Sequence, residues 1–264
     1  TLAQQALQDT AKIGDDVFST IEALVAEIDE KMSSQVNEIM HHPDFQKLES
    51  AWRGLDYLVS GSETGKDLKI RVMNISQKEL SSTFKQYRGA AWDQSPLFKK
   101  IYESEFGQLG GEPYATFVCD YQFDHTSQDL AIMKGLARIG AASHAPILSA
   151  ASSNLLNMDD WTEVSDPRDL SKRFSTTDHT AWNDFRASED SKYLALTMPR
   201  MLGRDIYDAR ENPIDEFEFT EVTDGQHDKH LWINSAYGMG VRVNAAFKEF
   251  GWCTRIRGVE SGGT

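Results

Sequence analysis

Cysteine is scarce in this sequence, with only Cys119 and Cys253 among 264 residues. Two cysteines are too few for a disulfide framework or for a zinc site built from thiolates, and such sparse use fits a reducing compartment. Long apolar runs are missing as well, because no stretch of about 18 strongly apolar residues occurs. These absences exclude a small disulfide-stabilised scaffold and argue against a chain that spans a bilayer.

Basic residues are outnumbered, with 27 lysines and arginines against 41 aspartates and glutamates and a net charge of −14. Nucleic-acid binding depends on lysines and arginines that release counterions from phosphates, so nucleic acid is not expected as the main partner. Residues 1–60 contain eleven acids and four bases, which is half of the excess negative charge. A solvated helix face explains this better than a dedicated site for a basic partner.

Hydrophobic spacing predicts that the chain starts with helices. Apolar residues recur every three or four positions between residues 17 and 39, which is typical of one long amphipathic helix. Pro43 interrupts it, and Asp44 can cap a second helix that ends at the glycine-rich stretch 61–65. We expect residues 1–60 to form a helical region that packs on the following domain.

Beyond this region the pattern alternates between helix and strand. Local capping signals predict helix starts at Ser76–Glu79, at Ser95-Pro96 and at Ser127. Strands are predicted at 68–75, 114–123, 146–150 and 194–198, and a last long helix at 229–250. The alternation indicates an α/β fold with a central, mostly parallel or mixed sheet flanked by helices. We expect one such domain over residues 61–264.

No phosphate-binding or metal-binding motif is complete. The stretch 61–67 resembles a phosphate-binding loop, but its spacer is one residue short and Asp67 stands where serine or threonine is needed. His227 and His230 have a spacing that suits a metal, but they flank Lys229, whose charge repels a cation. We therefore expect no metal and no cofactor.

One histidine has the surroundings of a general base. His144 lies at a predicted junction between helix and strand, and Cys119 and Asp120, near the end of the preceding strand, can lie close to it. No nucleophile elbow or glycine-rich oxyanion loop accompanies them. A core histidine or a hydrogen-bonded one is favoured, and a flavodoxin-like α/β enzyme that uses His144 and Asp120 is the alternative.

Two charged segments have simpler interpretations than catalysis. Residues 186–192 combine acids and bases and are expected to form an ion-pair network that fixes a turn. Arg255 and Arg257 alternate on an expected terminal strand, so both face one side of it and can meet a carboxylate.

Several segments follow the order of one known family over residues 30–263. They include an FGxxGGEP turn at 106–113, an AxHAP motif at 142–146 and an aromatic and charged stretch at 182–193. Further matching segments lie at 45–55, 167–170, 196–200, 231–234, 250–253 and 255–260. Together they resemble the large subunit of the contractile sheath of bacterial type VI secretion systems, the TssC/VipB family.

The resemblance singles out a set of structural or interface positions. They are Trp52, Arg53, Gly110, Gly111, Glu112, Pro113, His144, Pro146, Arg186, Ser188, Glu189, Asp190, Pro199, Arg200, Trp232, Trp252, Arg255 and Arg257. The sequence departs from the family pattern at Ala187, at Asp205 and Ile206, at Ile233 and at Ser261. These departures indicate a divergent member.

The resemblance implies a mechanical part without catalysis. Large subunits of this family pair with a small sheath subunit, and the heterodimers polymerise in the bacterial cytoplasm into a helical cylinder around an inner tube. Contraction drives the tube out of the cell, and an AAA+ ATPase recycles the sheath. Family members are nearly twice this length, so we expect a fragment: the middle α/β domain, without the family's N-terminal stretch and C-terminal core. A free-standing binding module is a third interpretation.

Overall fold

The computed structural model describes residues 17–164, 170–215 and 217–256. Packing divides the chain into two units. Unit 1 comprises Thr1–Trp52 and Leu202–Trp232, and unit 2 comprises Arg53–Met201 and Ile233–Thr264. Each unit is therefore built from two separate stretches of sequence. That residues 1–60 pack on the α/β domain stays a prediction.

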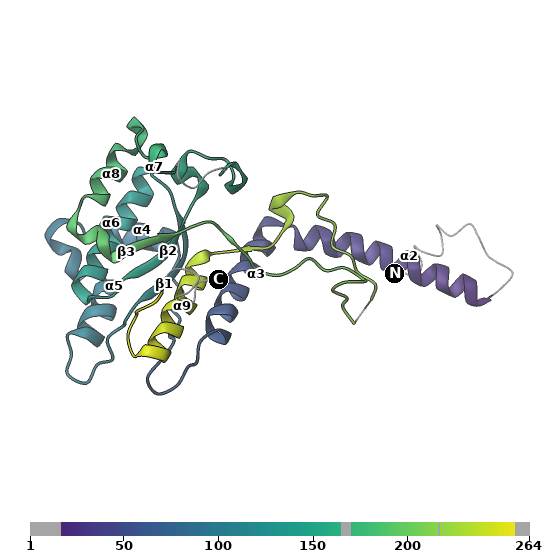
Figure 1. The fold of residues 1–264 in the computed structure, drawn as a ribbon, viewed down its shortest axis with the longest axis horizontal. Helices are drawn as coiled ribbons and strands as arrows, with labels where there is room; N and C mark the ends of the chain where they lie inside the picture. Colours follow the sequence, from purple (N-terminus) through teal and green to yellow (C-terminus); the bar gives the residue numbers. More distant parts are fainter. Residues whose placement is uncertain (1–16, 165–169, 216, 257–264) are drawn as a thin grey trace. The chain divides into compact units, whose positions relative to one another are not determined.

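Unit 2 is built on a three-stranded parallel sheet in the order β1-β2-β3 (Figure 1). The strands are β1 (Phe117–Phe123), β2 (Ile147–Ala151) and β3 (Leu194–Thr197). The central strand β2 is buried along its whole length. Helices cover both faces of a parallel sheet, which explains why this strand contains only small and apolar residues. The predicted α/β class is confirmed.

Helices flank this sheet on both sides. They are α4 (Gln77–Gln86), α5 (Pro96–Phe98), the π-helix η2 (Lys99–Phe106), α6 (Ser127–Ser143), α7 (Leu170–Arg173), α8 (Thr180–Arg186) and α9 (Ser235–Phe250). Helix α6 connects β1 to β2, and it lies on the opposite side of the sheet from α9 (Figure 1).

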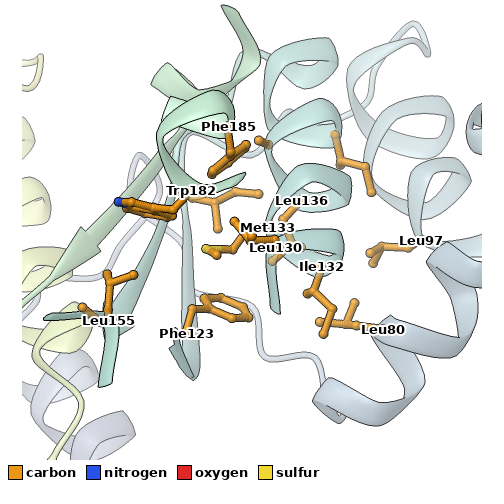
Figure 2. Close-up of a cluster of buried hydrophobic side chains, with 14 of the residues drawn as sticks. Leu80, Leu97, Phe123, Leu130, Ile132, Met133, Leu136, Leu155, Trp182 and Phe185 are labelled. Atoms are coloured by element: carbon orange, nitrogen blue, oxygen red, sulfur yellow. The ribbon is translucent and has the colours of Figure 1, made fainter. Parts of the chain in front are cut away.

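The main core of unit 2 lies between the sheet and α6. Phe123, Ile132 and Met133 are fully buried there, together with Leu155 (Figure 2). The opposite face of β1 carries Val118, which packs in a second cluster. The other members of that cluster are Leu58, Ile70, Tyr237 and Val241. Alternation of side chains along β1 thus supplies two separate cores.

Local capping explains where the helices of unit 2 begin. The Ser76 hydroxyl accepts the backbone N–H of Glu79, whose carboxylate accepts the N–H of Ser76, so the predicted capping box is confirmed. The Ser95 hydroxyl caps α5 by accepting the N–H of Phe98, with proline in the first turn. Helix α6 begins at Ser127, as predicted, and the Thr126 hydroxyl caps it by accepting the N–H of Asp129.

The predicted strand at 68–75 is wrong. The segment pairs with no strand among the described residues, and Val72 is 69% exposed. Lys69 and Arg71 bind carboxylates instead. The alternating pattern therefore marks an extended segment that buries Ile70 in part but does not pair with the sheet.

Two predictions near the end of the chain also need correction. Helix α9 begins at Ser235 instead of residue 229, because His227–Lys229 forms a 3-10 turn and β5 (Trp232–Ile233) pairs with β4 (Met201–Leu202). Arg255 has a φ of 52°, in the left-handed region, so it does not lie in the expected terminal strand.

Unit 1 pairs helix α2 (Val17–Met40) with the returning segment 203–231. The Asn37 side chain donates to the carbonyl of Thr220 over 3.1 Å and accepts the N–H of Val222 over 2.8 Å. It thus satisfies backbone groups of an extended segment as a neighbouring strand would. Helix α3 (Pro43–Ser60) follows, with Asp44 in its first turn instead of at the cap.

Candidate functional site

A cluster of charges around Arg204 holds unit 1 together. Its guanidinium contacts the Glu221 carboxylate at 2.6 and 3.2 Å and the Glu49 carboxylate at 2.8 Å. His41 Nε2 lies 3.3 Å from Glu221, and the N–H of Tyr207 donates to Glu221 over 3.1 Å. The Glu221 side chain is only 1% exposed and that of Arg204 9%. The cluster therefore joins α3 and the end of α2 to the returning segment.

Burial and pairing act in opposite directions in this cluster. Burial raises the pKa of Glu221, but hydrogen bonds from Arg204 and from the backbone of Tyr207 outweigh it, so the pKa lies below its ordinary value. Burial likewise lowers the pKa of Arg204, whereas its bonds to Glu221 and Glu49 raise it above its ordinary value. Both groups stay charged. No sequence motif marks this cluster, because its members come from three separate segments.

The turn motif at 106–113 depends on its glycines. Gly110 has a φ of 83°, which favours glycine. A Cβ on Gly111 would lie 2.2 Å from the carbonyl oxygen of Glu105, so this position has no room for a side chain. Pro113, which ends the motif, is exposed.

Charged side chains fix this turn to the extended segment before α4. Arg71 contacts Glu105 and Glu112, both at 2.6 Å, and Lys69 also pairs with Glu112. The N–H of Glu112 donates to the Glu105 carboxylate over 2.9 Å and, with Arg71, lowers the pKa of Glu105. Lys69 and then Arg71 lower the pKa of Glu112. The motif positions 110–113 thus form a salt-bridged surface turn.

His144 is exposed at the end of α6 and lies outside both core clusters. It ends α6 in the left-handed conformation, with a φ of 53°. Its Nδ1 lies 3.4 Å from the Tyr193 hydroxyl, and its ring lies 5.7 Å from the ring of Phe106. The carbonyl of Pro146 accepts the N–H of Phe117 over 3.0 Å. The AxHAP motif therefore joins the end of α6 to the start of the sheet.

The two residues predicted near His144 have other surroundings. Asp120 acts on Tyr237 of α9: burial and then Asp120 raise the pKa of that hydroxyl. Cys119 faces the main core, where burial raises the pKa of its thiol to about 12. Asp120 and Cys119 thus point to opposite faces of the sheet, and the geometry does not support a dyad of His144 and Asp120.

The predicted ion-pair network at 186–192 is wrong. Among the described residues no ion pair joins its members, and the arginine lies over a ring instead, with Arg186 Cζ 5.2 Å from the centre of Phe174. The Ser188 hydroxyl donates to the carbonyl of Phe185 over 2.6 Å, and Ser191 donates to the carbonyl of Arg186 over 2.9 Å. Glu189 and Asp190 open a 3-10 turn. Hydroxyl groups therefore fix this turn.

The remaining family positions have structural contacts or are exposed. Arg200 pairs with Asp160 at 3.0 Å, next to the cis peptide bond before Pro199. The Trp232 indole N–H donates to the carbonyl of His227 over 2.6 Å, and the two rings stack.

The aromatic and arginine positions at the ends of the described chain differ in exposure and contact. Trp52 and Trp252 are exposed, and Arg53 is half-buried in α3. Arg255 lies over the ring of Phe250 at 5.4 Å, and Arg257 lies outside the described residues.

Neither a metal site nor a membrane-spanning helix is found among the described residues. In the part of the chain that the structure describes, no group of three histidine, cysteine, aspartate or glutamate side chains could hold a metal ion. No helix within the same residues is long and apolar enough to cross a membrane.

Comparisons with known proteins match the whole chain. Residues 22–264 match the family model VipB, described as EvpB/VC_A0108, tail sheath N-terminal domain. The chain is also 54% identical over 264 residues to the type VI secretion system sheath protein TssC1 of Pseudomonas aeruginosa. That match covers 100% of this chain and 53% of the other protein. The chain thus spans about half the length of the curated relative that it matches.

Proposed function

Because the chain belongs to the VipB tail sheath family, we propose that it forms part of the structural subunit of a type VI secretion sheath. The family that the motifs predicted is confirmed. In our proposal the whole subunit assembles with the small sheath subunit into a helical polymer around the inner tube, and contraction of the polymer propels the tube out of the cell. The identity over the full length of the chain carries this proposal.

The architecture of unit 2 supports a mechanical role. Its sheet has a core on each face, and its surface turns are fixed by ion pairs and hydroxyl groups. Such a body moves as a rigid piece, so a change in sheath length is expected to rearrange contacts between subunits. The separate surroundings of His144 and Asp120 favour this role over the enzyme alternative.

The proposal includes further partners and a location. We infer contacts with neighbouring sheath protomers, the inner tube protein and a recycling AAA+ ATPase, all in the bacterial cytoplasm and without a cofactor. The family positions then act as structural or interface residues, and exposed ones such as Trp52 and Trp252 are candidates for contact.

Co-expression tests the proposal. The full-length subunit is produced with the small sheath subunit of the same cluster of genes, purified and imaged by negative-stain electron microscopy. We expect co-purification and tubes that contain both proteins. Failure of the two proteins to co-purify would contradict the proposal.

The variant His144→Ala distinguishes the sheath subunit from the enzyme alternative. For a sheath subunit we expect this variant to affect folding or assembly. Loss of a measurable turnover would favour an enzyme.

A further inference from the structure

An apolar groove of about 550 Å³ lies at the junction of α2 and α3 in unit 1. Its apolar lining is Ile39 of α2 with Phe45 and Leu48 of α3. Its polar lining includes Glu38 and Asp44. All of these residues belong to unit 1, so the groove is complete within one unit.

An exposed apolar stripe extends this groove along α3. Phe45, Leu48 and Trp52 follow each other at spacings of three and four residues, so they share one face of the helix. Leu48 is 56% exposed and Trp52 is 66% exposed. A contiguous exposed stripe of large apolar side chains, rimmed by polar groups, marks an interaction surface.

Charge indicates what can bind there. Unit 1 contains 19 acidic and 6 basic side chains, whereas unit 2 contains 22 and 21. Almost the whole net charge of the chain therefore belongs to the unit that carries the groove. Two carboxylates lie at the groove itself, and the Asp44 side chain is 94% exposed. A partner with positive charge gains from both the local and the overall field.

We propose that this groove binds a basic amphipathic helix of another protein. Apolar side chains of that helix, three and four residues apart, contact Phe45, Leu48 and Trp52, and flanking lysines or arginines contact Glu38 and Asp44. This is the mode in which an amphipathic helix binds a groove. The inference goes beyond the proposed function, since it depends only on the groove and the charge.

Charge also argues against two other occupants. A second copy of the chain would bring an equally acidic unit 1 to the groove. The first 16 residues of this chain contain three aspartates and one lysine, so they lack the complementary charge as well.

Calorimetric titration with a designed peptide tests the proposal. The probe is an 18-residue helical peptide with leucines three and four residues apart and lysines elsewhere. The control peptide has glutamates in place of the lysines. We expect the purified protein to bind the lysine peptide, to lose affinity as salt is added, and to reject the glutamate peptide. Absence of binding, or equal binding of both peptides, overturns the proposal.

Matched variants show whether the peptide lies in the groove. Leu48→Ser is expected to weaken binding about tenfold, because it removes a central apolar contact. Leu109→Ser is its control, since Leu109 is fully exposed in unit 2. Glu38→Gln combined with Asp44→Asn is expected to weaken binding, and Glu211→Gln, exposed in unit 1, is its control.

The outcomes separate this proposal from the proposed function. If Leu48→Ser binds the peptide like Leu109→Ser, the groove is not the site and the proposal is overturned. Circular dichroism confirms that each variant is folded, which the exposure of both leucines favours. Sheath formation is measured separately by electron microscopy. The groove proposal can therefore fail while the sheath proposal holds, and the reverse is also possible.

Discussion

At the scale of single residues, contacts from distant segments decide what each side chain does. The sequence favours a core or hydrogen-bonded His144; the structure places its side chain at the surface, where it contacts Tyr193 and Phe106. The motif search missed Arg204, whose partners Glu49 and Glu221 lie far away in sequence. Neither local spacing nor composition contains the information that brings such groups together.

The buried charges around Arg204 should be important for the stability of unit 1. Glu221→Gln removes one charge and leaves Arg204 without its main partner in a site that is little exposed. We expect the free energy of unfolding to fall by about 3 kcal/mol, the scale for breaking a buried pair. Urea denaturation measures it. Glu112→Gln, in an exposed pair, is the control and should change stability little; equal effects would contradict the assignment.

The same cluster predicts a dependence of stability on pH. Arg204 and Glu49 with His41 surround Glu221, and the folded-state pKa of Glu221 lies below its unfolded value. Its contribution is therefore present above about pH 4.5 and is lost as pH falls through the lower folded pKa. The difference in unfolding free energy between wild type and Glu221→Gln should shrink below about pH 4.5. A difference that stays constant from pH 7 to pH 3 would refute this.

At the scale of elements, the sequence predicted those that carry local signals. The capping box at Ser76 and the apolar stretches of β1, β2 and β3 were located correctly within a few residues. The segment 68–75 has the alternation of a strand, but it pairs with carboxylates of the turn at 106–113 instead of with the sheet. Alternation of apolar and polar residues indicates an extended backbone. Whether that segment pairs with a sheet depends on the position of the other strands in the fold.

The close approach of α3 and α9 in unit 2 gives a third prediction. A Cβ on Gly54 would lie 2.3 Å from the ring of Tyr237, which is buried. Overpacking in Gly54→Ala should therefore lower the free energy of unfolding by about 2 kcal/mol. This loss exceeds the roughly 1 kcal/mol that the alanine gains in helix propensity.

A glycine with open space around it serves as the control for steric overlap. Gly65 has no atom within 4 Å of an added Cβ, so Gly65→Ala should not destabilise the protein. Thermal unfolding compares the two variants. Equal melting temperatures for both would mean that the two helices do not pack as described.

At the scale of the whole molecule, the distribution of charge follows the fold and not the order of the sequence. The first 60 residues hold half of the excess negative charge, whereas unit 1 holds nearly all of it. The difference comes from residues 202–232, which return to α2 through Asn37. An acidic helix face was the simpler interpretation of the sequence, because the return of the chain could not be seen there.

A density map of the assembled sheath tests whether this chain is a structural part of the sheath. The full-length subunit is co-expressed with the small sheath subunit, and the polymer is imaged by electron cryomicroscopy. We expect a helical polymer in which the parallel sheet β1-β2-β3, with α6 and α9 on opposite faces, repeats as a rigid body in every subunit. A polymer that lacks this chain, or in which this sheet has another strand order, would contradict this expectation.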